Sequence, residues 1–292
     1  MNRIHRSWPA AAALAASALL LAAGSAAAQS AAELLPQKYR DAGVIKLVTD
    51  AKYPPFQYID ESGNMVGFEV DLWNAIAEKL NVTMEVTSVA FDSMIPGVQS
   101  GRWDIAMEAI TDNPERQAVV SFVDYGYTTS AAYVLDAKGA EINTHLDLCG
   151  RSGAAHSGTE WVGFITNELA KACEEAGKPA PTLSEYGTSD ATLLAVYAGR
   201  TDFVLTSAAS AQEIIKAAPQ PVKIVQVPIL PRKPSGIAFR KDEEDLGKAL
   251  LAALKEVRAD GTYDRIYAEW NVEAMKMDHE PGINLETVAS EN

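Results

Sequence analysis

The strongest constraint on the fold is a regular alternation of strand-like and helix-like segments that begins at residue 44. Short apolar runs predict strands, whereas Leu72, Ile76 and Leu80 recur at the spacing of one helix face. Such an alternation is typical of a parallel or mixed sheet flanked by helices. It predicts strands over Val44–Thr49, Thr83–Val89 and Trp103–Ala109, and helices over Asp71–Leu80, with Asp71 as N-cap, and over Ser93–Ser100.

The same alternation restarts near residue 150 and predicts a second unit of similar size. Its expected strands are Arg151–Ala155, Thr182–Tyr186 and Asp202–Thr206, and its expected helices are Glu160–Glu175 and Ala191–Ala198. Two more helices are expected over Asp245–Val257 and Tyr263–Trp270. The tail, residues 271–292, is polar, and we expect it to be loosely ordered. The fold class is therefore α/β with two lobes.

The N-terminus is typical of a secretory signal peptide. Met1–Pro9 is cationic, Ala10–Ala23 carries no charge, and Ala26–Ala28 supplies the small residues that a signal peptidase requires. We expect residues 1–28 to be removed and the rest to be freely soluble in the periplasm. The alternative is a permanent anchor, but the apolar run is shorter than the roughly 20 residues that span a bilayer. No Cys lies near the cut, so no lipid anchor is expected.

The cysteines are Cys149 and Cys173, both beyond the signal segment. In an oxidising compartment we expect them to form a disulfide, which would stabilise the fold by about 3 kcal/mol. The alternative is two free buried thiols. No Cys-x-x-Cys motif occurs, so we expect no redox role.

Charge and missing motifs exclude several functions. The 292 residues carry 25 Lys and Arg against 39 Asp and Glu, and a net charge of −14 disfavours nucleic acid and anionic membranes as partners. Gly153 and Gly158 have phosphate-loop spacing, but Thr159 and Glu160 follow where Lys and Ser or Thr are needed. Metal-binding and serine-hydrolase motifs are missing from the sequence, so we expect no metal and no cofactor.

One segment resembles a family signature: Gly67-Phe68-Glu69-Val70-Asp71-Leu72, followed by Ile76, Ala77 and Leu80. It is similar to that of the bacterial extracellular solute-binding proteins of family 3, the polar-amino-acid-binding components of ABC importers. Further matching motifs lie in order within residues 43–270, and they are Tyr53-Pro54-Pro55-Phe56, Gly101-x-x-Asp104, Thr111-x4-Arg116, Phe122-x-x-Tyr125, Ser157-Gly158-Thr159, Gly199-Arg200-x-Asp202, Gly236-Ile237-Ala238-x-x-Lys241 and Asp260-Gly261-Thr262-Tyr263.

The resemblance implies the two-lobed periplasmic-binding-protein fold of type II, in which each lobe is a mixed sheet flanked by helices. The first lobe would then be discontinuous, with residues 40–131 and 230–270, and the second would comprise residues 132–229. Two extended crossover strands would form the hinge, and we expect them near 130–134 and 226–231.

Arg116 and Thr111 are the expected carboxylate-binding residues of the first lobe. The planar guanidinium of Arg116 suits a bidentate carboxylate contact, and the Thr111 hydroxyl and backbone N–H add hydrogen bonds. The resemblance implies that Arg116 binds the α-carboxylate of the ligand; the alternative is a surface Arg paired with Glu115. Thr159 would contact the same carboxylate from the second lobe, unless it is simply an N-cap.

Tyr53 and Phe91 match the aromatic residues that enclose the ligand side chain in this family. The alternative for each is a place in the core. We expect Phe56 to pack inside the lobe, and Trp161 to face either the cleft or the core of the second lobe.

Four acidic residues of the motifs are expected to be structural. Glu69 and Asp71 are interpreted as a strand-end charge and a helix cap, respectively. Asp104 and Asp202 lie in Gly-x-x-Asp segments, which are typical of turns and helix ends.

Position 207 departs from the family pattern. Amino-acid binders of the family usually have an Asp there, which binds the α-ammonium of the ligand, but this chain has Ser207. A buried ammonium without an anion is costly, so we expect Glu108, beside the Ala109 carbonyl, to bind a cationic group of the ligand. The alternative is that Glu108 points to solvent. His156 would be a second donor near the cleft or a surface residue.

The sequence therefore predicts a monomeric periplasmic protein that captures an amino acid, or a related small carboxylate or zwitterion, between two lobes. It would deliver this ligand to an inner-membrane ABC permease that has a separate ATPase, without catalysing a reaction. The alternative is an enzyme of the same fold that resembles periplasmic cyclohexadienyl or arogenate dehydratases, with Glu108 and His156 as acid and base.

Overall fold

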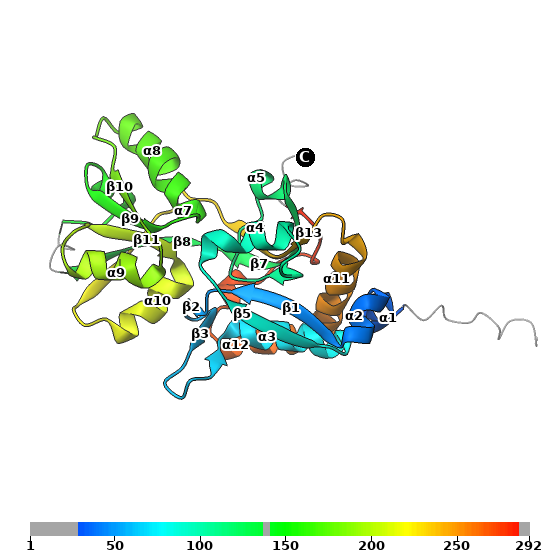
Figure 1. Ribbon diagram of the computed structural model, residues 1–292. Helices are drawn as coiled ribbons and strands as arrows, with labels where there is room; N and C mark the ends of the chain where they lie inside the picture. Colours follow the sequence, from blue (N-terminus) through cyan, green and yellow to red (C-terminus); the bar gives the residue numbers. More distant parts are fainter. Residues whose placement is uncertain (1–28, 137–140, 286–292) are drawn as a thin grey trace, which may run out of the picture.

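Two five-stranded sheets, each flanked by helices, form the framework of the protein (Figure 1). The computed structural model describes residues 29–136 and 141–285. The predicted signal segment, residues 1–28, lies outside the described residues. Within the described ranges, every helix is too short or too polar to cross a membrane.

The first sheet is mixed and has the order β5–β1–β6–β13–β7. β1 pairs in parallel with β5 and β6, whereas β13 is antiparallel to β6 and β7. Leu47 and Val48, which are adjacent on β1, are fully buried in separate clusters, so helices cover both faces. The bounds of the strands are β1 Val44–Thr49, β5 Thr83–Ser88, β6 Ile105–Ala106, β7 Val120–Thr128 and β13 Lys233–Arg240.

The second sheet repeats this pattern with the order β10–β9–β11–β8–β12. β9 is parallel to β10 and β11, and β8 is antiparallel to β11 and β12. Its strands are β8 Ser130–Leu135, β9 Ser152–His156, β10 Thr182–Tyr186, β11 Phe203–Ser207 and β12 Val222–Gln226. A small antiparallel sheet on the first lobe comprises β2 Lys52–Tyr53, β3 Gln57–Ile59 and β4 Met65–Val66. The predicted two-lobed fold with mixed sheets is confirmed.

The helices are interleaved with these strands. On the first lobe they are α1 Ala31–Leu34, α2 Gln37–Ala42, α3 Phe68–Leu80, the 3₁₀ turn η1 Phe91–Ser93, α4 Met94–Gln99, α5 Pro114–Gln117, α11 Glu244–Ala259, α12 Thr262–Glu269 and η4 Glu273–Met275. On the second lobe they are η2 His145–Leu148, α7 Glu160–Gly163, the π-helical η3 Phe164–Leu169, α8 Ala170–Glu175, α9 Ser189–Tyr197 and α10 Ala208–Ala217. The expected helix Glu160–Glu175 is thus a continuous segment with a π-helical middle.

The start of α3 differs from the prediction. Gly67, with φ +141°, is the N-cap, and a Cβ there would lie 2.1 Å from the Phe56 carbonyl oxygen, so only glycine fits. Asp71 is therefore in the first turn rather than at the cap, and its carboxylate accepts a hydrogen bond of 2.7 Å from Trp270 Nε1. This contact ties α3 to the C-terminal end of α12.

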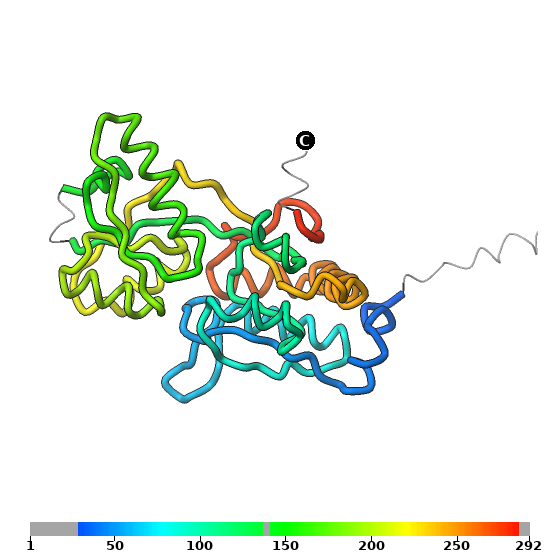
Figure 2. The backbone as a smooth tube through the Cα atoms, turned by 45° about the horizontal axis from the view of Figure 1, so that its top comes forward, coloured from blue at the N-terminus to red at the C-terminus, as the bar shows by residue number. Residues whose placement is uncertain are grey.

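The chain passes between the lobes twice, and Figure 2 shows the two connecting segments running close together. The first crossing is at Thr129, between β7 and β8, one residue before the predicted range of 130–134, which lies within β8. The second crossing is at residues 227–232, between β12 and β13, close to the predicted 226–231.

The Gly-x-x-Asp acids tie neighbouring strands together in both lobes. Asp104 accepts hydrogen bonds from Lys46 N at 2.8 Å and the Tyr39 hydroxyl at 3.2 Å. Asp202 accepts them from Ser152 N at 3.0 Å and from the Ser152 hydroxyl at 2.9 Å. Their structural role is confirmed, although they anchor the start of a strand rather than a turn or helix end.

The tail is ordered on the first lobe up to residue 285, so the expectation of a loose tail was wrong for its described part. Met275 and Met277 are buried. The Asn284 side chain accepts a hydrogen bond of 2.8 Å from Phe122 N of β7, and Asn284 N donates one of 3.1 Å to the Phe122 carbonyl. The pairing could not be predicted from the polar composition because most of these hydrogen bonds are made by backbone groups, which every residue carries.

The disulfide between Cys149 and Cys173 is present, as predicted. It joins the residue after η2 to α8 and closes a loop of 24 positions within the second lobe.

Candidate functional site

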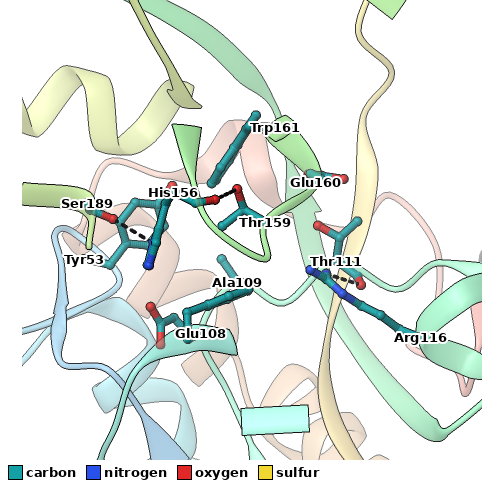
Figure 3. Close-up of a pocket in the computed structure, with 11 residues that line it drawn as sticks. Tyr53, Glu108, Ala109, Thr111, Arg116, His156, Thr159, Glu160, Trp161 and Ser189 are labelled. Carbon is teal, nitrogen blue, oxygen red and sulfur yellow. Dashed lines mark hydrogen bonds between the residues drawn. The ribbon is translucent and has the colours of Figure 1, made fainter. Parts of the chain in front are cut away.

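The carboxyl ends of the parallel strands in both lobes face a cavity whose empty space, including the part open to solvent, is about 330 Å³ (Figure 3). Ligands bind at this edge in open α/β sheets because the loops after the strands leave a crevice. The cavity is lined by Tyr53, Phe91, Glu108, Ala109, Thr111 and Arg116 of the first lobe and by His156, Thr159, Glu160, Trp161 and Ser189 of the second.

Seven of the eight residues predicted to bind the ligand line this cavity. They are Tyr53, Phe91, Glu108, Ala109, Thr111, Arg116 and Thr159. Ser207, the eighth, is buried next to the cavity without lining it.

Arg116 lies in the short helix α5, where the Asn113 side chain caps its backbone N–H at 2.9 Å. Its guanidinium donates to the Thr111 carbonyl at 2.9 Å and, across the cleft, to the Gly158 carbonyl at 3.0 Å. The hydrogen bonds therefore go to carbonyl oxygens of both lobes, and not to Glu115 as the alternative supposed. Burial lowers the pKa of Arg116 because it removes water from the charged guanidinium. An anionic ligand would stabilise this charge by replacing the lost water with charge-assisted hydrogen bonds.

Thr159 occupies the N-cap position of α7, but its side chain makes no capping bond. Its hydroxyl instead donates to the His156 carbonyl at 2.6 Å. The interpretation as a simple N-cap was wrong because this contact turns the hydroxyl back toward the loop. Thr159 lines the cavity near Thr111 and Arg116 (Figure 3).

Aromatic rings form the apolar wall. Tyr53 stacks on Phe56 with ring centroids 4.8 Å apart, and Phe56 is fully buried inside the lobe as expected. Trp161 lies 6.2 Å from the Tyr53 ring, and its Nε1 donates to the Ser130 hydroxyl at 3.2 Å. Trp161 therefore both lines the cavity and belongs to the core, as does Tyr53.

Glu108 is 3% exposed, so the alternative of a solvent-facing side chain was wrong. One oxygen, Oε2, accepts a hydrogen bond of 2.7 Å from Asp50 N and a longer one of 3.5 Å from the Thr49 hydroxyl. Burial, and then the nearby negative charge of Asp50, raise the pKa of Glu108 well above its ordinary value. Glu108 thus forms an acidic end of the cavity that would favour a cationic group.

His156 faces Glu108 from the second lobe (Figure 3). Its Nε2 lies 3.2 Å from the Gly187 carbonyl and its Nδ1 lies 3.3 Å from the Ser189 hydroxyl. Burial lowers the pKa of His156, so the neutral ring is favoured near pH 7. It lines the cavity and is not a surface residue.

Comparison with known proteins agrees with the resemblance noted in the sequence. The family model of the bacterial extracellular solute-binding proteins, family 3, matches residues 45–273. The chain belongs to this family. Among curated relatives, the ABC transporter arginine-binding protein 1 of Escherichia coli is 30% identical over 229 residues, which cover 77% of this chain and 90% of that protein.

Solved structures of amino acid-binding proteins share the fold. An ancestral arginine-binding protein bound to arginine is 32% identical, with a TM-score of 0.68 and coverage of 78% of this chain and 98% of that one. An ancestral amino acid-binding protein, described as a precursor of cyclohexadienyl dehydratase, is 28% identical, with the same TM-score of 0.68 and coverage of 80% and 97%.

Ser207 has a structural role in this family 3 protein. It is the N-cap of α10, and its hydroxyl accepts a 3.0 Å hydrogen bond from Ser210 N. Its own N–H donates to the Tyr53 hydroxyl at 3.2 Å, across the cleft. Position 207 thus supplies no anion to a ligand ammonium, and Glu108, the acid that lines the cavity beside Ala109, belongs to the first lobe.

Three residues were not predicted from the sequence: Glu160 and Ser189, which line the cavity, and Asp50, whose backbone N–H donates to Glu108. Asp50 follows β1 directly, and Ser189 begins α9 after β10. Their only sequence signal is a position just after a parallel strand, which points to the binding edge but is shared by many residues that bind nothing.

Proposed function

We propose that the protein binds an amino acid, or a related small carboxylate, that also carries a cationic group. The observation that carries this proposal is the charge arrangement of the cavity: Arg116 lies at one side, and Glu108 lies at the other (Figure 3). A ligand with one charge of each sign matches both ends. The predicted ligand-binding residues, Tyr53, Phe91, Glu108, Ala109, Thr111, Arg116, Thr159 and Ser207, are retained here as a proposal, with Ser207 acting only through the Tyr53 hydroxyl.

The carboxylate of the ligand would bind near Arg116. This guanidinium now uses two of its donors on the carbonyls of Thr111 and Gly158. Because a guanidinium has five N–H donors, others remain for a carboxylate. The Thr111 and Thr159 side chains lie on the same side of the cavity and would add contacts from both lobes (Figure 3).

The cationic group would bind at Glu108. Burial favours the protonated form of this carboxyl, and an ammonium or guanidinium would favour the ionised form instead. Binding of a cationic ligand should therefore release a proton. The curated relative named above is an arginine-binding protein, and arginine carries a carboxylate together with cationic groups of the kind proposed here.

A ligand that contacts both lobes stabilises the closed arrangement because its contacts differ between the open and closed forms. The lobes would follow the predicted ranges, 40–131 with 230–270 and 132–229, except that residues 31–39 and 271–285 join the first lobe and β8, from Ser130, joins the second. The mature chain would act as a monomer in the periplasm after loss of residues 1–28, without a lipid anchor, and would pass its ligand to an ABC permease with a separate ATPase. In this proposal the protein is not an enzyme.

A thermal-shift screen with L-arginine, L-lysine, L-ornithine and neutral amino acids tests the ligand class. A ligand at 100 times its Kd adds about 2.7 kcal/mol to the stability. Isothermal titration of L-arginine with Glu108→Gln should then give a Kd at least 10-fold higher than that of the wild type. The exposed Glu85→Gln is the control and should bind normally. An unchanged Kd for Glu108→Gln would exclude the acid as the cation site.

A dehydratase-like enzyme is the second candidate because Glu108 and His156 face each other across the cavity, where they would serve as acid and base (Figure 3). The dehydratase-precursor structure described above shares this fold. Incubation with prephenate or arogenate, followed by product analysis, separates the two functions: turnover that Glu108→Gln abolishes would establish the enzyme.

A further inference from the structure

The loop after β6 contains a backbone conformation that its residue does not favour. Ala109 has φ +46°, in the left-handed region, where a side chain with a Cβ is disfavoured. On either side, ordinary sheet-like hydrogen bonds hold the chain: Met107 N donates to the Val48 carbonyl at 3.2 Å, and the Ile110 carbonyl accepts from Gly236 N at 3.0 Å. Glu108 and Ala109 are turned out of the sheet between these bonds, so another group must stabilise the left-handed Ala109.

That group is Glu69, in the first turn of α3. Ala109 N donates to Glu69 Oε1 at 2.8 Å. Glu69 is fully buried, and the Tyr125 hydroxyl donates to the same oxygen. The Tyr125 carbonyl accepts from the hydroxyls of Tyr263 at 2.7 Å and Tyr267 at 2.9 Å, so residues from β7 and α12 fix the position of the carboxyl.

The turn at Ala109 determines what faces the cavity. Glu108, Ala109 and Thr111 all line it, and they do so within four consecutive positions. A strand continued in the regular pattern would send neighbouring side chains to opposite faces of the sheet. The left-handed residue breaks this alternation, which lets both Glu108 and Thr111 face the cavity, at its opposite ends.

We propose that Glu69 is a positioning residue of the binding site, which holds Ala109 in its left-handed conformation so that Glu108 and Thr111 face the ligand. The inference rests on the proposed function, since it concerns the same cavity. It assigns to Glu69 a role beyond the strand-end charge that the sequence suggested. Glu69 does not line the cavity, so it acts through the loop.

Two substitutions separate positioning from a general contribution to folding. Glu69→Gln keeps an oxygen that accepts from Ala109 N and the Tyr125 hydroxyl, whereas Glu69→Leu removes it. The matched control is Asp104→Leu, because Asp104 also accepts one backbone N–H and one Tyr hydroxyl but lies at the other end of β6. Glu69→Asp, which withdraws the carboxyl by one methylene, replaces Glu69→Leu if the latter does not fold.

Amide hydrogen exchange of Ala109 in the protein without added ligand is the first measurement. Exchange should be at least 10-fold faster in Glu69→Leu than in the wild type, and near the wild-type rate in Glu69→Gln and Asp104→Leu. In the Glu69→Leu background, Ala109→Gly should restore part of the L-arginine affinity, because glycine adopts a positive φ without strain.

The outcomes are distinct. Unchanged Ala109 exchange in a folded Glu69→Leu protein would refute the proposal, as would equal acceleration in Asp104→Leu. If wild-type protein does not bind L-arginine, the proposed function fails for that ligand while the exchange rates still decide the role of Glu69. If L-arginine binds the wild type, Glu69→Leu raises its Kd at least 10-fold and the added Ala109→Gly lowers that Kd again, the positioning role is supported.

Discussion

Replacement of Glu69 by Gln should change how the stability of the protein depends on pH. Burial raises the pKa of Glu69 from 4.5 to about 7, and the hydrogen bonds from Tyr125 and Ala109 offset only part of that effect. Between these two values the folded protein keeps a proton that the unfolded chain has released. The free energy of unfolding should therefore decrease as pH rises through this window.

The size of the effect follows from the shift. One pKa unit corresponds to about 1.36 kcal/mol, so a shift from 4.5 to about 7 corresponds to on the order of 3 kcal/mol. Glutamine does not titrate, so this contribution is absent in the variant. The stability of the wild type relative to Glu69→Gln should accordingly fall by on the order of 3 kcal/mol between about pH 4.5 and pH 8.

Urea unfolding followed by tryptophan fluorescence, at intervals over this pH range, measures the difference. Glu108 titrates in both proteins, so its contribution to the pH dependence of the stability largely cancels in the difference. The exposed Glu85→Gln is the control and should run parallel to the wild type. A wild-type-minus-variant difference that stays constant with pH would refute the reasoning, because Glu69 would then not carry an elevated pKa.

Three further substitutions test the site and its framework. Arg116→Gln should raise the Kd for L-arginine at least 10-fold in calorimetry, and a normal Kd would contradict its role. Gly236→Ala should lower the free energy of unfolding by about 1–3 kcal/mol, because its Cβ would lie 2.7 Å from a carboxylate oxygen of Asp124; a neutral result in urea unfolding would show that the strand shifts freely. Cys149→Ala with Cys173→Ala should cost about 3 kcal/mol of stability, as measured by urea unfolding, and reductant should then have no further effect.

The lobes and their order could be predicted because the evidence for them is local. The periodicity of Leu72, Ile76 and Leu80 marks α3, and all three side chains are buried. Arg116 and Thr111 could be proposed from their chemistry within a matching motif. Each of these predictions needs only residues that are close in sequence.

The remaining features depend on contacts between distant segments. Asp50 joins Glu108 only because β1 and β6 are neighbours in the sheet, although 58 positions separate the two residues. The left-handed Ala109 has no sequence signal of its own, since alanine disfavours that conformation and Glu69, 40 positions away, compensates for it. Sequence periodicity does not report such compensation.

The length of the short strand β6 also could not be predicted from the hydrophobic pattern. β6 has two residues where the sequence predicted seven, because the chain leaves the sheet at the loop that carries Glu108 and Ala109. The apolar run continues through that loop since its residues are buried in the cleft. Burial in a binding site and burial in a sheet give the same hydrophobic signal.

The ordered tail also protects an edge of the sheet. β7 is the outermost strand of the first sheet, and its outer side would present free backbone groups to other molecules if it were bare. Residues 282–285 cover it: Asp124 N donates to the Gly282 carbonyl at 3.0 Å, and Ile283 forms a bridge with Val123. The family match ends at residue 273, so a chain cut there would keep the whole matched region but expose this edge, and self-association by strand pairing would be the consequence.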